Sequence, residues 1–462
     1  MINHFLFALI IITTISCKTS EKRKADVSKT ELNGFYEQQG EGQIVEINDS
    51  LVTSFYSSSF NCFPEWKISR DYFNTQTPTI KVIDENTFTN QEGYTVFTYK
   101  KLKIKPTFCK ELTEEQINSN IYNFETLWHT FNDQYAFFKE RNIDWNELKK
   151  KYKSQFTEQT SPFEFYLLLE KMVLELDDAH SDFEVPDDFD DQWHTLNKKQ
   201  DTTNYRNLAK DKILENFVTD VQKYNGGQIA WGNIDENLAY IQINGMDGLA
   251  DYQPSNASEY WEKAEESDDY DKDLIDGTHK IATKIINEIQ NKKVCIIDFR
   301  FNQGGYDWVG LAFMSHFIDK KYNIFKKKRR FEDNYSDYQI IDLEPTKPAY
   351  LKNVYILTSP FTVSAAETTT IATMNFPNFK RVGSYTNGAL SDVLYKELPN
   401  GWTYWLSNEV YETTNGKLFE VKGITPHYKI DYPKEEIELF KAMNSEFDNQ
   451  DRAIEKVKEI IK

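Results

Sequence analysis

A short apolar strand that runs into a helix through a serine-containing turn is the most restrictive feature of this sequence. Residues 355–357 are predicted to be a buried strand, residues 358–360 end it, and a helix is expected from about Ala365. Ser364 would then stand at the first turn of the helix, where backbone N–H groups lack intrahelical partners and attract negative charge. A nucleophile of acyl transfer needs such an exposed oxygen beside donors for an oxyanion. Serine also commonly caps helices, so this turn alone leaves both interpretations open.

A second apolar strand, at residues 294–299, runs into a turn that contains Gly304 and Gly305. Two glycines after a buried strand permit positive φ and close backbone approach, so their N–H groups can point at one spot. Many strand-to-helix turns use such a pair, and by itself it is weak evidence. The alternation of strands and helices over residues 229–432 predicts an α/β core.

The remainder of the chain divides by pattern and composition. Short alternating segments separated by Asn, Asp and Gly predict a β-rich accessory domain, and apolar residues at helical spacing behind capping boxes at Thr113 and Ser161 predict a helical domain. The stretch after it is polar and weakly patterned, so we expect a connecting segment there. The predicted organisation is a signal at 1–17, a tether at 18–30, the β-rich domain at 31–110, the helical domain at 111–183, the connecting segment at 184–228, the core at 229–432 and a C-terminal helix at 433–462.

Charge and composition exclude several classes of ligand. The chain has 54 basic and 73 acidic residues, a net charge of −19, which argues against nucleic acid or an anionic membrane surface as the main ligand. No CxxC or HExxH spacing occurs and the seven histidines are scattered, so we expect neither a metal site nor a cofactor. The oligomeric state is not predictable from these features.

The N-terminus resembles an export signal. The apolar run at residues 5–15 is too short to span a bilayer and long enough for the core of a signal peptide. It ends in Thr14-Ile15-Ser16-Cys17, which resembles a bacterial lipobox with Cys17 as the lipidated residue. No Lys or Arg precedes the run, and Thr14 stands where leucine is usual. A lipid-anchored protein of the cell envelope is therefore expected, with an ordinary cleaved signal and secretion as the alternative.

The remaining cysteines suit an exported protein. Cys62 and Cys109 flank a strand-rich region and could form a disulfide in an oxidising compartment, or could both be free. Cys295 lies within an apolar run and is predicted to be a buried thiol.

Five stretches together resemble a known family, the serine peptidases of the C-terminal-processing and tricorn-core group. The resemblance covers residues 113–432 and leaves the β-rich domain outside it. It implies a ClpP/crotonase-like core of βαβ units with an N-terminal helical bundle, and it implies hydrolysis of peptide bonds in a peptide or protein substrate. The matching stretches, in the order of the family, are LDDAHSDF at 176–183, DFRFNQGG at 298–305, TSPFTVSAAE at 358–367, GSYTNG at 383–388 and FEVKGITP at 419–426.

The family has two catalytic styles, and the sequence resembles one of them. The serine–lysine style takes its lysine from a GxxTxGKG segment, where this chain has Asn387 and Ala389, neither of which can act as a base. The tricorn-like style uses a histidine from the helical domain and a glutamate near a GI-P motif. His180 and Glu420 stand at those positions.

This resemblance implies a complete catalytic set. Ser364 would be the nucleophile, His180 the general base and Glu420 the carboxylate that orients the histidine. The backbone N–H groups of Ala365 and of Gly304 or Gly305 would form the oxyanion hole.

Two departures from the family pattern affect these expectations. The tricorn core has a serine directly before its histidine, where this chain has Ala179, so Ser181 or a water would have to link Glu420 to His180. No convincing PDZ-like segment precedes the core, which weakens an expectation of processing tagged C-termini. The alternative from another class is a catalytically inactive module that binds peptides or small ligands in the same cleft.

Overall fold

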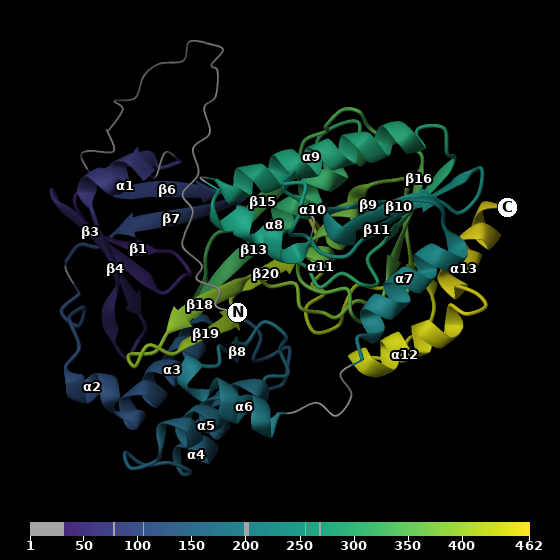
Figure 1. Cartoon of the computed structure of the whole chain (residues 1–462). Coiled ribbons are helices and arrows are strands. Elements are labelled where there is room, and N and C mark those ends of the chain that lie inside the picture. The colour runs from purple at the N-terminus through teal and green to yellow at the C-terminus, as the bar shows by residue number, and fades with distance from the viewer. Residues whose placement is uncertain (1–31, 77–78, 105, 198–202, 255, 268) are drawn as a thin grey trace, which may run out of the picture.

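The computed structural model describes residues 32–462 apart from 77–78, 105, 198–202, 255 and 268. The protein is a mixed α/β structure with an N-terminal antiparallel sheet, a helical region and a larger core built around a mixed sheet (Figure 1). The predicted signal, the tether and Cys17 lie outside the described residues.

The N-terminal sheet has seven antiparallel strands in the order β4-β3-β2-β1-β7-β6-β5. Tyr36, Val52 and Phe88 lie in its buried core, and a disulfide joins Cys62 to Cys109, so the pairing that the sequence left open is formed. The strand-rich prediction for this region is confirmed. Its elements are β1 (Gly34–Gln38), β2 (Gln43–Ile47), β3 (Leu51–Ser57), β4 (Cys62–Ser69), α1 (Arg70–Gln76), β5 (Lys81–Asp84), β6 (Thr87–Glu92) and β7 (Thr95–Lys101).

The helical region begins at the first predicted capping box. Both boxes are present: the Thr113 and Ser161 side chains accept from the N3 backbone N–H, and Gln116 and Glu164 reciprocate. The last helix leads to a short strand that pairs with β19 of the core, so one three-stranded sheet joins the two regions. The elements are α2 (Glu114–Asn118), α3 (Asn120–Gln134), α4 (Trp145–Lys153), α5 (Pro162–Leu174), β8 (Asp182–Phe183), β18 (Val393–Glu397) and β19 (Thr403–Ser407).

The prediction of a connecting segment at 184–228 is wrong. The segment contains α6 (Asp190–Leu196), α7 (Tyr205–Phe217) and the edge strand β9 (Thr219–Tyr224). Helix α7 buries only Ala209, Ile213 and Leu214, and the strand is largely exposed, so neither has the strong periodicity that identifies an element from sequence. Tertiary packing against the core stabilises both elements.

The core sheet has the order β21-β17-β16-β12-β11-β10-β9 and is parallel from β11 to β21. Every residue of β11 and β12 is buried, because helices cover both faces of the sheet. The carboxyl ends of its parallel strands therefore meet at one edge, which is where a site is expected in such sheets. The strands are β10 (Ile229–Asn233), β11 (Leu238–Ile243), β12 (Val294–Asp298), β16 (Asn353–Thr358), β17 (Phe379–Gly383) and β21 (Tyr428–Lys429).

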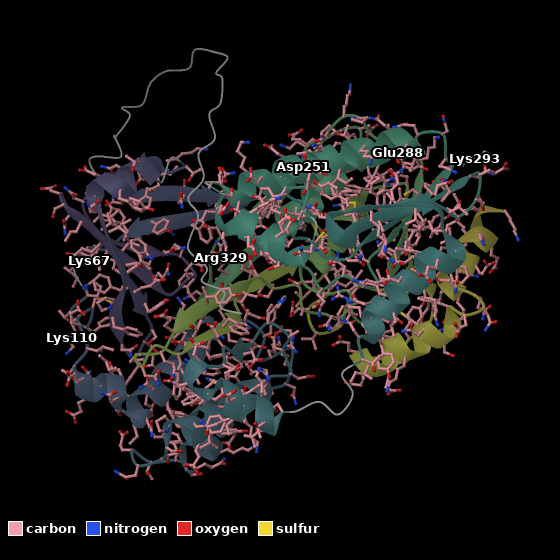
Figure 2. The ribbon with its side chains drawn as sticks, in the orientation of Figure 1. Lys67, Lys110, Asp251, Glu288, Lys293 and Arg329 are labelled. Atoms are coloured by element: carbon pink, nitrogen blue, oxygen red, sulfur yellow. A yellow bond between two sulfur atoms is a disulfide. The ribbon has the colours of Figure 1, made fainter. Side chains whose placement is uncertain are left out.

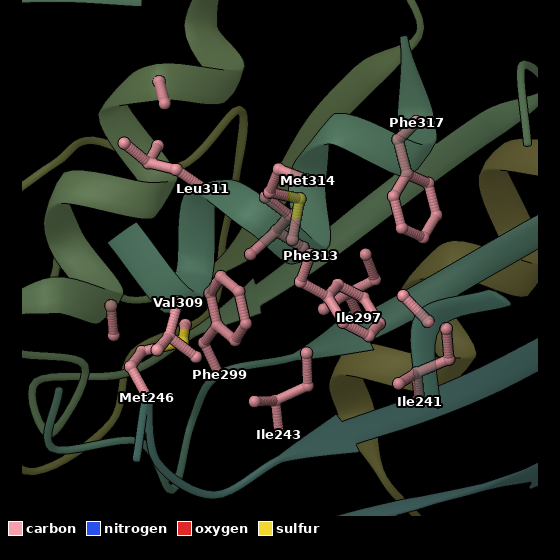
Figure 3. Close-up of a cluster of buried hydrophobic side chains, with 14 of the residues drawn as sticks. Ile241, Ile243, Met246, Ile297, Phe299, Val309, Leu311, Phe313, Met314 and Phe317 are labelled. Atoms are coloured by element: carbon pink, nitrogen blue, oxygen red, sulfur yellow. The ribbon is translucent and has the colours of Figure 1, made fainter. Parts of the chain in front are cut away.

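Two hydrophobic cores lie on the two faces of this sheet. One contains Ile241, Ile297 and Phe313 and is closed by α9, α10 and α11 (Figure 3). The other is closed by α7 and by the two C-terminal helices. The chain breaks between these two helices, and the side chain of Asp451 caps the second. The helices are α8 (Ala257–Glu265), α9 (Tyr270–Ile289), α10 (Asp307–Met314), α11 (Ala365–Ala372), α12 (Glu436–Glu446) and α13 (Arg452–Ile461).

A four-stranded sheet connects the core to the N-terminal sheet. Arg329, near the middle of Figure 2, pairs with Glu41 of the N-terminal sheet region at 2.6 Å and with Glu409 at 2.6 Å. These charges are buried and mutually paired, so the accessory domain is docked by an ion network as well as by packing. The strands are β13 (Tyr322–Phe331), β14 (Asn334–Tyr335), β15 (Gln339–Leu343) and β20 (Glu409–Glu412). None of the helices within the described ranges is both long and apolar enough to cross a membrane.

Candidate active site

Ser364 lies between the end of β16 and the start of α11, as the sequence predicts. Its backbone has φ 59° and ψ −129°, a conformation that L-residues rarely adopt outside functional turns. It occupies the N-cap position, but its side chain makes no capping hydrogen bond. Helix capping therefore does not explain this serine.

The glycine turn after β12 packs directly against Ser364. A Cβ atom added to Gly304 would lie 2.5 Å from the Ser364 Cβ and 2.9 Å from its Oγ, and Gly304 has φ 98°. Both facts require glycine at this position. Asn302 holds the turn, because its Oδ1 accepts a hydrogen bond from the Gly304 N–H at 2.8 Å.

The residues that follow Ser364 and Gly304 in the chain each have a backbone N–H group that is free to act as a donor. Within the described part of the chain, neither the Ala365 nor the Gly305 N–H has a hydrogen-bond acceptor, whereas the Gly304 N–H donates to Asn302. Gly305 is also exposed. Of Gly304 and Gly305, the two glycines proposed from the sequence, Gly305 is thus the one whose backbone N–H group is free to donate to an oxyanion.

Each of the three predicted catalytic residues contacts one short segment, residues 389–391. The Ser364 N–H donates to the first carbonyl of the segment at 3.0 Å. Glu420 Oε2 accepts hydrogen bonds from the other two backbone N–H groups at 2.8 and 3.2 Å. The His180 ring interacts with the backbone of the last residue of the segment. Residues from the helical region, from α11 and from the C-terminal part of the core are thereby brought together.

His180 is buried, with 9% of its surface exposed. Burial lowers the pKa of His180 by disfavouring the imidazolium, and Arg141 acts in the same direction, while Asp178, Asp392 and the backbone of Ser391 oppose it. The His180 Nδ1 has no hydrogen-bond partner among the described atoms. The ring is therefore held as a neutral base with one nitrogen available.

A buried arginine links Glu420 to the His180 turn. Arg141 Nη2 lies 3.4 Å from Glu420 Oε1, and its Nε lies 3.4 Å from Asp178 Oδ2. Asp178 Oδ1 in turn accepts the backbone N–H of His180 at 2.9 Å. The sequence left open how Glu420 is linked to His180, because Ala179 stands where the family has a serine. In the structure, Arg141 provides a link through its ion pairs with Glu420 and Asp178.

Ser181 does not take the place of the serine that the family has before its histidine. Its hydroxyl accepts a hydrogen bond from the Ser407 N–H at 3.3 Å and so fixes the neighbouring strand β19. Ser181, one of the two links between Glu420 and His180 that the sequence left open, is thus engaged with β19 instead.

Sequence reasoning missed Arg141, Asp178 and Glu367 as parts of the site. Glu367 is fully buried on α11, and its carboxylate accepts the backbone N–H groups of Gly388 at 2.8 Å and Ala389 at 2.9 Å. It thereby fixes the loop that contacts Ser364. Its position one turn after the serine on a helix was a usable signal, whereas Arg141 lies in an unremarkable polar stretch and gave none.

Burial makes ionisation of two carboxylates of the site, Glu420 and Glu367, less favourable. Burial raises the pKa of Glu420 well above its usual range, and Asp178 and Glu367 add to the effect, while Leu390 N–H and Arg141 oppose it. Burial also raises the pKa of Glu367 to about 7. The positive charge of Arg141 therefore favours the ionised form of Glu420 against the effect of burial.

Comparison with known proteins identifies the core. Residues 237–430 match the family model of peptidase family S41, and residues 119–173 match that of the tricorn protease C1 domain. The chain carries a peptidase family S41 domain. This places it among the serine peptidases, which are hydrolases.

Solved structures show the same fold at low identity. A protein described as a peptidase from Parabacteroides merdae is 18% identical, with 71% of this chain and 96% of that chain covered and a TM-score of 0.52. Mature CPAF, solved in complex with lactacystin, is 12% identical, with 75% and 98% covered and a TM-score of 0.51. A lipoprotein from Streptococcus agalactiae is 14% identical, with 74% of this chain and 98% of that chain covered and a TM-score of 0.44. The first two of these structures thus share the fold of this chain at low sequence identity.

Proposed function

We propose that this S41 peptidase cleaves peptide bonds of exported proteins or peptides through an acyl-enzyme, as a tricorn-like relative of the C-terminal-processing peptidases with a ClpP/crotonase-like core. Ser364 attacks the scissile carbonyl while His180 takes the hydroxyl proton and later gives it to the leaving amine. Glu420 fixes the position of the histidine through residues 389–391. The N–H groups of Ala365 and Gly305 stabilise the oxyanion, each donor contributing about 3 kcal/mol to lowering the barrier.

The observation that carries this proposal is the state of the Ser364 hydroxyl. The hydroxyl makes no capping hydrogen bond, and Ser364 has positive φ and packs against Gly304. The next residues after Ser364 and Gly304, which are Ala365 and Gly305, have backbone N–H groups without an acceptor in the described part of the chain. A serine placed only for helix stability would use its hydroxyl to cap the helix. Asn387 and Ala389 supply no alternative base beside it.

The test is hydrolysis of a peptide library by the purified full chain, together with labelling by a fluorophosphonate probe. We expect cleavage fragments from a subset of the library and stoichiometric labelling. A folded protein that binds library peptides but neither cleaves nor labels would instead identify an inactive binding module. The fragments would also define the residues that the cleft prefers on each side of the cleaved bond.

Arg141 is proposed as a positioning residue that favours the ionised form of Glu420 and holds the His180 turn. Arg141→Met should lower kcat/KM by about 10- to 100-fold, within the range seen when a partner that orients a functional side chain is lost. The acid limb of the kcat/KM profile should also move to higher pH, because Arg141 lowers the pKa of both His180 and Glu420. The measurement is kcat/KM between pH 5 and 8.

Arg141→Lys is the matched control for this prediction. A lysine keeps the charge but cannot bridge two carboxylates, so its acid limb should stay near that of the wild type while kcat/KM still falls. Removing one partner from a buried ion network costs about 3–5 kcal/mol, so unfolding is measured for both variants at the assay pH. Unchanged kcat/KM and an unchanged acid limb in folded Arg141→Met would refute the positioning role.

Lipidation of Cys17 is proposed to hold the enzyme at the bacterial cell envelope. Cells that express the wild-type chain should incorporate a fatty-acid analogue into it, and Cys17→Ser should abolish that incorporation and release the protein from the membrane fraction. Label retained in Cys17→Ser, or a mature protein that begins elsewhere, would favour the ordinary cleaved signal.

A further inference from the structure

A polar cavity of about 230 Å³ lies at the far end of α11 from Ser364. Met374 and Asn375 of its wall follow the helix directly, so at a rise of about 1.5 Å per residue the cavity lies roughly 15 Å from the serine. The opposite wall comes from residues 413–417 and from the segment that carries Glu420. The cavity is therefore separate from the turn that holds Ser364.

The wall of this cavity offers hydrogen-bond donors and positive charge. Arg381 and Lys417 contribute cations, and neither has a carboxylate partner within the described ranges. Arg381 Nε donates to the Thr425 carbonyl at 3.3 Å, and no described acceptor lies against its two Nη groups. Thr414 and Asn415 add a hydroxyl and an amide at the rim.

The charge of Arg381 is uncompensated. Burial lowers the pKa of Arg381 to about 10, and no acidic residue in the described ranges offsets this effect. The pKa of His427 falls to about 4, because burial and the charges of Arg381 and Lys380 all disfavour its protonation. This spot is thus positive in a chain whose net charge is −19.

Glu412, directly before Thr413 of the wall, already has a paired charge. Glu412 pairs with Lys326 at 3.2 Å and accepts the Tyr338 hydroxyl at 2.9 Å. No Asp or Glu is present among the described residues that line the cavity. A partly buried guanidinium without a counter-charge is unfavourable unless a ligand supplies one.

We propose that this cavity binds a small oxyanion, a carboxylate or phosphate group, between Arg381 and Lys417. The guanidinium offers its two Nη groups in the fork geometry that suits a planar or tetrahedral oxyanion, and the lysine adds a point charge. Phe419 and Thr425 of the wall flank the turn that bears Glu420, so an occupied cavity would also hold that turn. The binding site does not depend on the catalytic assignment.

The experiment is calorimetric titration of the full chain with inorganic phosphate and with two versions of one short peptide, ending in a free carboxylate or an amide. Arg381→Met/Lys417→Met should weaken anion binding about tenfold or more, the effect of losing at least one charged hydrogen bond. The matched control removes two lysines from the N-terminal sheet region, Lys67→Met/Lys110→Met, and should bind as the wild type does (Figure 2).

Each outcome of the titration decides the proposal. Binding of phosphate alone supports a free-phosphate site, and binding of the free-acid peptide but not of its amide supports a terminal carboxylate. Failure of the wild type to bind either anion, or equal binding by the double variant, overturns the proposal. If Arg381→Met fails to fold, exposed Lys417→Met is used alone with Lys67→Met as its control. Loss of anion binding with retained peptidase activity, or the reverse, separates this site from the proposed function.

Discussion

Ser364→Ala should abolish peptide hydrolysis and fluorophosphonate labelling, with kcat falling on the order of 10⁶-fold, the effect of removing the nucleophile from a serine–histidine pair. The fold should be retained, because the Ser364 hydroxyl makes no capping bond and alanine tolerates the same backbone conformation as serine. The measurement is turnover of a peptide identified from the library, together with the thermal unfolding of both proteins.

The control for this experiment is an exposed serine on another helix. Ser258→Ala, on α8, removes an equivalent hydroxyl and should leave both activity and labelling intact. Persistent labelling of Ser364→Ala would show that another residue reacts with the probe and would remove Ser364 from its assigned role.

His180→Ala should produce a loss of similar size, because a serine without its base remains a weak nucleophile. The double variant with Ser364→Ala should be no slower than either single variant, since the two residues act as a unit. His194→Ala, an exposed histidine of α6, is the matched control and should retain full activity. A strictly additive double variant would mean that the two side chains act separately.

The pH profile of the wild type gives an independent readout of His180. Its pKa is lowered by burial and by Arg141, against the opposing effects of Asp178, Asp392 and Ser391, so the ring stays neutral below the ordinary histidine value of about 6.5. As pH falls through this lowered pKa, the ring is protonated and the base is lost. The stability contributed by the buried neutral ring is lost in the same direction. An acid limb of kcat/KM above pH 6.5 would contradict this environment.

Local patterns determined a large part of this protein from sequence alone. Capping boxes at Thr113 and Ser161, the alternation of the N-terminal strands and the apolar strands before Gly304 and Ser364 depend on residues close in the chain, so their outcome was predictable. The order of five short motifs then identified the family. The same reasoning missed the helix and the strand within residues 184–228. Packing against distant parts of the chain stabilises α7 and β9, and their own sequence patterns are weak.

Only the tertiary structure decided how the site is connected. Residues 389–391 lie against Ser364, Glu420 and the His180 ring at once, although these come from parts of the chain up to 240 positions apart. The Arg141 link to Glu420 spans 279 positions, and no local pattern marks it. The unpaired charge of Arg381 was also not predictable from a local pattern. Whether a charged residue has a counter-ion depends on all the segments that pack around it. Sequence reports which groups are present, whereas the pairing and burial of charges depend on which distant segments the fold brings into contact.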